Sequence, residues 1–145
     1  MEYYKELRKY VGHRPLILPG SVVIIQNEFG NVLLQERQKG VFGLPGGLMD
    51  LGESFEETAV REVFEEANLN VTSLELKQVF SGKEFYYKVD NGDEFYSVTA
   101  VFIADSYEGT LKANLSESIG IAFYSLDAMP KGLLTSSKKF LKTCL

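Results

Sequence analysis

One segment near the middle of the chain constrains the fold more than any other. Between residues 54 and 67, apolar residues recur every three or four positions, which predicts an amphipathic helix. Ser54 and Glu57 have the spacing of a capping box at its start, and Asn68 suits the left-handed conformation that often ends a helix. Short aliphatic runs lie on both sides, so this helix is expected to pack against a sheet.

Before this helix, residues 22–26 and 32–35 predict a β-hairpin around a turn-prone segment. After it, strands are expected at residues 71–80, 83–89, 94–103 and 119–124. The second and third of these are joined at Asp90-Asn91-Gly92-Asp93, and Asn-Gly is the pair favoured in two-residue hairpin turns.

Helices are expected at both ends of the chain, over residues 3–11 and 133–141, and Pro15 and Pro19 are expected to break the chain after the first helix. Together these elements predict an α/β fold of the mixed α+β kind, with a mixed β-sheet between helices. The 145 residues are expected to form a single domain, with residues 1–20 as an N-terminal helical segment packed on it.

Composition excludes several classes of protein. The formal net charge of −5 argues against a protein that binds duplex nucleic acid, which needs a basic surface. An acidic protein can still hold phosphates through metal ions that its carboxylates bind. Cys144 is the only cysteine, so no internal disulfide can form. With no apolar run long enough to cross a membrane and a charged N-terminus, we expect a cytoplasmic protein without a membrane partner.

Three carboxylates form a cluster on the central helix. Its core-facing side is expected to contain Phe55, Ala59, Val60, Val63, Phe64 and Ala67. Glu62, Glu65 and Glu66 stand at i, i+3 and i+4 beside that side, and Glu66 is expected to point partly inward. A divalent cation would relieve their repulsion, and oxygen ligands favour Mg²⁺ or Mn²⁺. The alternative is a solvated acidic face in which Arg61 pairs with Glu57 and Glu65.

The loop Gly43-Leu44-Pro45-Gly46-Gly47 precedes this helix. It is either a tight turn or a stretch of bare backbone that approaches a ligand. From Gly47 onward the chain resembles the signature of the Nudix hydrolase family. The matching positions are Gly47, Glu53, Arg61-Glu62, Val63, Glu65-Glu66 and Leu69, with Asn68 in place of the last glycine.

The resemblance implies roles for individual residues. Glu62, Glu65 and Glu66 match the metal-binding carboxylates, and Gly46 matches a position that lends a backbone carbonyl to the metal. Arg61 matches the arginine that orients the acids, with Glu53 as its partner. Glu117 stands where some members place a further ligand or base; the alternative is an ordinary loop carboxylate.

The reaction implied is Mg²⁺-dependent hydrolysis of a diphosphate linkage in a nucleoside diphosphate derivative. Glu62, Glu65 or Glu117 would accept the proton from the attacking water. The alternatives are a non-catalytic module that senses nucleotides, an ADP-ribose or nucleotide-sugar pyrophosphatase, and an enzyme acting on capped RNA. The acidic charge disfavours the last of these.

The residues that bind the rest of the substrate are harder to predict. Tyr86 and Tyr87 stand where the resemblance would imply a preference for dinucleoside polyphosphates, but tyrosine is also common in strands. Arg37 would contact a phosphate or be a surface charge, and His13 is given no catalytic role. Phe42, Phe85 and Phe95 are either pocket or core residues. The tyrosine-rich N-terminal helix would cover its own domain or pack on a second subunit, so a homodimer stays open.

Overall fold

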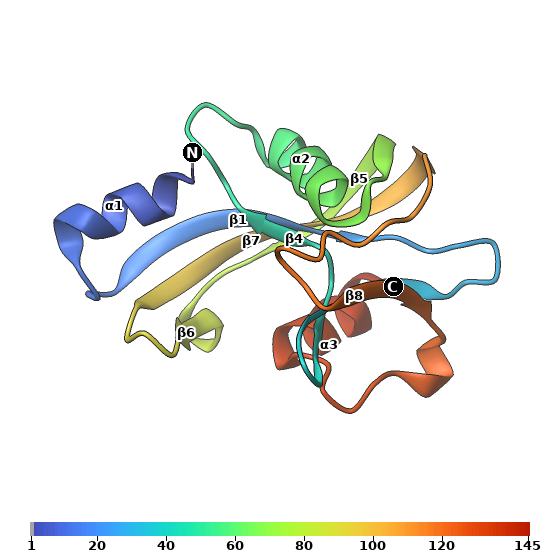
Figure 1. Cartoon of the computed structure of the whole chain (residues 1–145). Coiled ribbons are helices and arrows are strands. Elements are labelled where there is room, and N and C mark those ends of the chain that lie inside the picture. Colours follow the sequence, from blue (N-terminus) through green and yellow to red (C-terminus); the bar gives the residue numbers. More distant parts are fainter. Residues whose placement is uncertain (1) are drawn as a thin grey trace.

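The computed structural model describes residues 2–145, and in them it shows two sheets and three α-helices (Figure 1). The larger sheet has the order β4 (Gly46–Leu48), β1 (Leu16–Ile24), β7 (Glu94–Glu108) and β5 (Asn70–Phe80), with β6 (Tyr86–Lys88) also paired to β7. The smaller sheet has the order β3 (Val41–Gly43), β2 (Val32–Gln38) and β8 (Gly120–Tyr124). The helices are α1 (Tyr3–Val11), α2 (Phe55–Ala67) and α3 (Thr135–Cys144), and the short helices are η1 (Lys83–Phe85) and η2 (Leu126–Ala128).

The larger sheet is mixed, because β1 runs parallel to β7 while its other pairs are antiparallel. Its two faces bury separate hydrophobic clusters, one with α2 and one with α3. Neighbouring residues of β1 illustrate this: Val23 packs with the α2 cluster and Ile24 with the α3 cluster, as strand alternation requires. The predicted mixed sheet between helices is therefore confirmed.

The ends of α2 are those predicted from sequence. The Ser54 hydroxyl accepts a hydrogen bond from the Glu57 amide at 3.0 Å, and the Glu57 carboxylate accepts one from the Ser54 amide at 2.9 Å. Asn68 adopts a φ of 62°, the left-handed conformation that ends the helix. Of the residues expected to face the core, Ala59, Val63 and Ala67 are fully buried.

Phe64 does not follow the predicted pattern, because it is 57% exposed. Thr58 is fully buried instead, and its hydroxyl donates to Glu53 Oε1 at 2.9 Å. The apolar stripe that faces the sheet is therefore narrower than helical periodicity predicts. Thr58, a polar residue in this stripe, binds the Glu53 carboxylate.

The N-terminal prediction was wrong for residues 16–20. These belong to β1, and Pro19 lies inside the strand rather than breaking it. β1 pairs with β4 only from Gly20 to Val22, and the Pro19 carbonyl accepts from the Met49 amide at 3.0 Å. The nitrogen of Pro19 therefore faces the side on which the β4 ladder has ended, where its missing N–H removes no strand pairing.

The predicted hairpin of residues 22–26 and 32–35 is correct only at its turn. Gln26 pairs with Val32, and the Asn27 amide donates to the Asn31 carbonyl at 3.0 Å. Beyond this turn the two strands enter different sheets. Both edges of β1 are already occupied, by β4 and β7, so β2 pairs with β3 and β8 instead.

The predicted strand at residues 83–89 begins as the short helix η1, and β6 follows it. Gly82, with a φ of 109°, redirects the chain, and Phe85 turns into the core against Phe80 and Phe140. The hairpin from β6 to β7 is confirmed, but its loop has three residues between the bonded pair Val89 and Asp93. No helix in the described part of the chain is long and apolar enough to cross a membrane.

Replacing Ser54 with alanine removes the acceptor for the Glu57 amide and should lower the free energy of unfolding by about 1 kcal/mol. Urea unfolding followed by circular dichroism measures the change. Ser81→Ala is the control, because Ser81 is exposed and lies outside any helix. Equal stability of the two variants would show that the capping box contributes nothing.

Candidate active site

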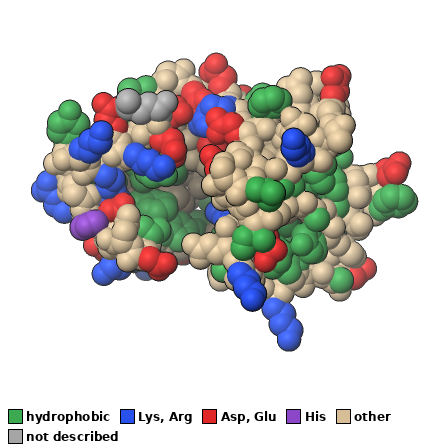
Figure 2. All heavy atoms as spheres, in the orientation of Figure 1, with side chains coloured by type: hydrophobic (Ala, Val, Ile, Leu, Met, Phe, Trp, Pro, Cys, Tyr) green, Lys and Arg blue, Asp and Glu red, His purple; other side chains and the backbone are tan. Residues whose placement is uncertain are grey.

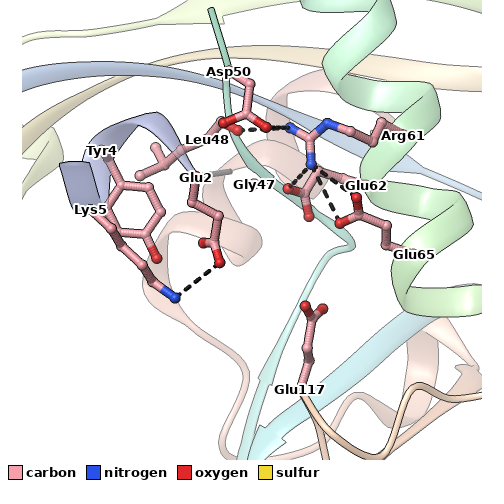
Figure 3. A pocket seen from close by; sticks show the side chains of 10 residues that line it. All are labelled: Glu2, Tyr4, Lys5, Gly47, Leu48, Asp50, Arg61, Glu62, Glu65 and Glu117. Carbon is pink, nitrogen blue, oxygen red and sulfur yellow. Dashed lines mark hydrogen bonds and ion pairs between the residues drawn. The ribbon is translucent and has the colours of Figure 1, made fainter. Parts of the chain in front are cut away.

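A cavity of about 660 Å³ opens beside the middle and the C-terminal half of α2. It is lined by Glu2, Tyr4, Lys5, Gly47, Leu48, Asp50, Arg61, Glu62, Glu65 and Glu117. Figure 2 shows a deep hollow between the α1 region and the rest of the domain, and Figure 3 shows side chains from α1, α2 and the loop before β8 facing one another across the cavity. Segments far apart in sequence thus place carboxylates around one space.

Arg61 organises this cluster. Its Nε donates to Glu53 Oε2 at 2.6 Å and its Nη2 to Glu53 Oε1 at 2.9 Å, which is a bidentate ion pair. Nη2 also donates to the Leu48 carbonyl at 3.1 Å. The guanidinium holds the pKa of Glu53 down to about 2, and Glu53 in turn raises the pKa of Arg61. Arg61 is thus fixed between α2, β4 and the loop that carries Glu53.

Glu62 lies between Arg61 and the bare backbone of Gly47. Arg61 Nη1 donates to Glu62 Oε1 at 2.9 Å. A Cβ atom at position 47 would stand only 2.5 Å from the Glu62 carboxyl carbon, so glycine is needed for the carboxylate to lie there. Burial raises the pKa of Glu62 to about 7 despite the neighbouring guanidinium.

Glu66 is the buried acid of the group, with 5% of its surface exposed. Its Oε1 accepts from the Gly46 amide at 2.9 Å, so the carboxylate joins α2 to the first residue of β4. Burial, followed by repulsion from Glu62, raises the pKa of Glu66 to about 8. The inward direction predicted for this residue is therefore confirmed.

Glu65 and Glu117 complete the acidic lining. The Glu65 side chain is 43% exposed, and its Oε1 lies 3.4 Å from Arg61 Nη1. This pair is one that the alternative of a solvated acidic face predicts. Glu117 comes from the loop before β8 and lines the same cavity as Glu62 and Glu65. Glu117 lies across the cavity from α2 (Figure 3). Because it is outside the signature, the spacing of the signature residues does not predict this position.

The residues present fit a hard divalent cation. Within residues 2–145, no three acidic, histidine or cysteine side chains already surround one point, since Arg61 holds Glu62 and Glu65 while the Gly46 amide holds Glu66. The group nevertheless offers oxygen donors only, and burial disfavours the charged forms of Glu62 and Glu66. A cation of the Mg²⁺ type stabilises such carboxylates in their charged form.

Three predicted substrate-binding residues lie outside this lining. Arg37 rests against Gly43, and its Nη2 donates to the Leu44 carbonyl at 2.9 Å. Tyr86 and Tyr87 belong to β6 at the margin of the larger sheet. Tyr86 donates a hydrogen bond to Glu94, and the Tyr87 ring packs on Phe95 with centroids 5.3 Å apart.

Phe42, Phe85 and Phe95, each predicted to be either a core or a pocket residue, do not all lie in the same kind of place. Phe85 is buried, and Phe42 packs edge-on against Tyr124 with centroids 5.6 Å apart. Phe95 lines a second cavity, together with Val89 and Asn91 of the β6–β7 hairpin. Sequence reasoning missed Tyr4 and Lys5, because residues of the N-terminal helix carry no motif that points to the cavity.

A NUDIX domain model matches residues 17–144. The chain belongs to the Nudix family. The predicted resemblance is thus confirmed, and with it the assignment to the Nudix pyrophosphohydrolases. The Nudix signature falls on β4, α2 and the loop between them, which form one side of the acidic cavity.

Relatives and solved structures agree with this assignment. The chain is 32% identical over 132 residues to the ADP-ribose pyrophosphatase of Methanocaldococcus jannaschii, covering 88% of this chain and 72% of that protein. It is 31% identical to a putative 8-oxo-dGTP diphosphatase of Bacillus subtilis, covering 83% and 74% respectively. The crystal structure of a MutT Nudix hydrolase from Burkholderia pseudomallei has a TM-score of 0.76 at 24% identity, covering 90% of this chain and 99% of that one, which shows the shared fold.

The bidentate pair of Glu53 and Arg61 predicts a specific pH dependence of stability. Because the folded-state pKa of Glu53 is about 2 and lies below the ordinary value of 4.5, the pair stabilises the fold above pH 4.5. This contribution is lost as the pH falls through about 2. Solvent at the cavity edge screens the pair, so Glu53→Gln should cost about 1 to 2 kcal/mol at neutral pH.

Urea unfolding of the wild type and Glu53→Gln between pH 7 and pH 2.5 measures this effect. The stability difference between them should shrink steadily below pH 4.5. A difference that is independent of pH would mean that the Glu53 charge does not stabilise the fold.

Proposed function

We propose that the protein is a Mg²⁺-dependent hydrolase that cleaves a diphosphate linkage in a nucleoside diphosphate derivative. The observation that carries this proposal is the grouping of Glu62 and Glu65 with Glu117 around one cavity, next to the buried Glu66. Burying a carboxylate costs free energy, so a helix whose acids served only as a solvated face would not bury Glu66. A diphosphate substrate needs a divalent cation to reduce its negative charge before it can enter so acidic a cavity.

The Glu62, Glu65 and Glu66 carboxylates and the Gly46 carbonyl would hold the ion. When bound, Mg²⁺ supplies a Lewis acid that neutralises phosphate oxygens and makes water more acidic. Arg61 keeps the acids in place through its bond to Glu53, so it acts as a positioning residue. Glu62, Glu65 or Glu117 accepts the proton from the attacking water, since all three line the cavity.

The relatives guide the choice of substrates to test. One is named an ADP-ribose pyrophosphatase and another a putative 8-oxo-dGTP diphosphatase, so ADP-ribose and nucleoside triphosphates are the first candidates. Tyr86 and Tyr87 do not line the acidic cavity, which removes the support they gave to a preference for dinucleoside polyphosphates. A nucleotide-sensing module would bind these compounds without turnover.

A release assay over ADP-ribose, nucleotide sugars, nucleoside triphosphates, dinucleoside polyphosphates and capped RNA tests the proposal. Turnover of at least one compound should require Mg²⁺ or Mn²⁺. Glu62→Gln and Glu65→Gln should each lower kcat/KM by about 100-fold or more, the scale of lost acid–base or charge stabilisation.

Glu56→Gln is the matched control, because Glu56 lies exposed on the same helix and outside the cavity lining. Its kcat/KM should stay within about twofold of the wild type. No turnover of any compound would favour the sensing module over the hydrolase.

Mg²⁺ should also stabilise the fold, because it binds carboxylates that are gathered only in the native state. At a concentration 100 times its Kd, the gain in unfolding free energy is about 2.7 kcal/mol. Differential scanning fluorimetry with and without Mg²⁺ measures the shift in Tm. The shift should disappear in Glu65→Gln and persist in Glu56→Gln, and an equal shift in both variants would place the ion elsewhere.

A further inference from the structure

A second cavity of about 580 Å³ adjoins the acidic one and shares Tyr4, Lys5 and Leu48 with it. Its other lining residues are Arg8, Leu18, Val89, Asn91, Asp93 and Phe95. The two cavities therefore form one cleft that is acidic at the α2 end and largely apolar at the end near the β6–β7 hairpin. The apolar side chains in the hollow of Figure 2 agree with this description.

Helix α1 forms the wall where the two cavities meet. The Tyr3 amide donates to Asp50 Oδ1 at 3.0 Å, and Arg8 Nη2 donates to the Glu94 carbonyl at 2.6 Å. The helix is thus fixed near its start to the loop after β4 and near its end to the first residue of β7. The match to the NUDIX domain model begins at residue 17, so α1 lies outside the shared segment.

Lys5 is the cation at this junction that a substrate can recruit. In the described chain, the cations lining the acidic cavity are Lys5 and Arg61, and Arg61 is held in a bidentate pair by Glu53. Among residues 2–145, the ion pair that Lys5 forms is with Glu2, at 2.9 Å, and both side chains are more than half exposed. An exposed pair of this kind costs little to break. A phosphate is a strong partner for an ammonium group.

The far end of the cleft suits a nucleoside. Leu18, Val89 and Phe95 give it apolar walls. Asn91 and the ion pair of Arg8 with Asp93 add polar groups. Small-molecule sites commonly combine apolar walls with a few polar groups that fix orientation. The volume is separate from the acidic end, so a diphosphate and a nucleoside can be bound side by side.

We propose that α1 supplies substrate-binding residues to this enzyme, with Lys5 contacting the diphosphate and the apolar end of the cleft receiving the nucleoside. This inference rests on the proposed function and names where its substrate is bound. Tyr4, which lines both cavities, forms part of the wall between the two halves of the substrate.

Isothermal titration calorimetry with Mg²⁺ present and ADP as the probe tests the role of Lys5. Lys5→Met should weaken ADP binding about tenfold, the value of one charge-assisted hydrogen bond. Lys9→Met is the matched control, since Lys9 is an exposed lysine of the same helix that lines neither cavity. It should bind ADP as the wild type does.

A second variant tests the apolar end with two probes. Val89 is 44% exposed, so Val89→Trp should fold normally while filling the cleft. It should weaken ADP binding about tenfold and leave the binding of inorganic diphosphate unchanged, whereas Lys5→Met should weaken both. Val79→Trp, at a residue 43% exposed on β5, is the control and should change neither.

The outcomes separate this inference from the proposed function. Equal ADP affinity of Lys5→Met and Lys9→Met, equal effects of Val89→Trp on both probes, or no ADP binding by the wild type would each overturn the inference. Turnover by a wild type whose Lys5 and Val89 variants bind normally would leave the hydrolase proposal intact. Binding with the predicted pattern but without turnover would support the cleft and refute the hydrolase.

Discussion

The hydrogen bond from the Gly46 amide to the buried Glu66 carboxylate joins helix α2 to strand β4 of the larger sheet. A carboxylate with 5% exposure is costly to bury, and its bond at 2.9 Å to the amide of Gly46, the first residue of β4, offsets part of that cost. This contact places the preceding turn of α2, with Glu62, against Gly47. Arg61, beside Glu62 on the helix, donates hydrogen bonds both to Glu62 and to Glu53.

Two kinds of constraint thus meet in the site. Apolar burial of Ala59, Val63 and Ala67 fixes α2 on the sheet in a way that depends only on side-chain volume. The carboxylates beside this stripe are held by directional bonds to a guanidinium and to backbone amides. The first constraint makes the fold stable. Burial raises the pKa values of Glu62 and Glu66 despite these bonds, and a cation can lower them.

The sequence predicted the parts of the molecule that depend on local pattern. The capping box, the left-handed Asn68 and the inward Glu66 all follow from spacing along one helix. Errors arose where distant partners decide the outcome. Strand β1 continues through Pro19 because it pairs with β7 from Leu16 to Ile24, and β2 joins another sheet because β4 and β7 already flank β1. Lys5 could not be predicted for the same reason, since only the tertiary packing of α1 brings it to the cavity.

Gly46 and Gly47 have a wider consequence. A Cβ atom at position 46 would stand 2.2 Å from the Ser21 carbonyl oxygen, and one at position 47 would collide with Glu62. At Gly46 the main chain of β4 therefore lies directly against that of β1, and at Gly47 it lies directly against the Glu62 carboxylate of α2. A side chain at either position would push β4 away from β1 or move the Glu62 carboxylate from its place beside Arg61, so these two glycines hold the acidic edge of the cleft where it is.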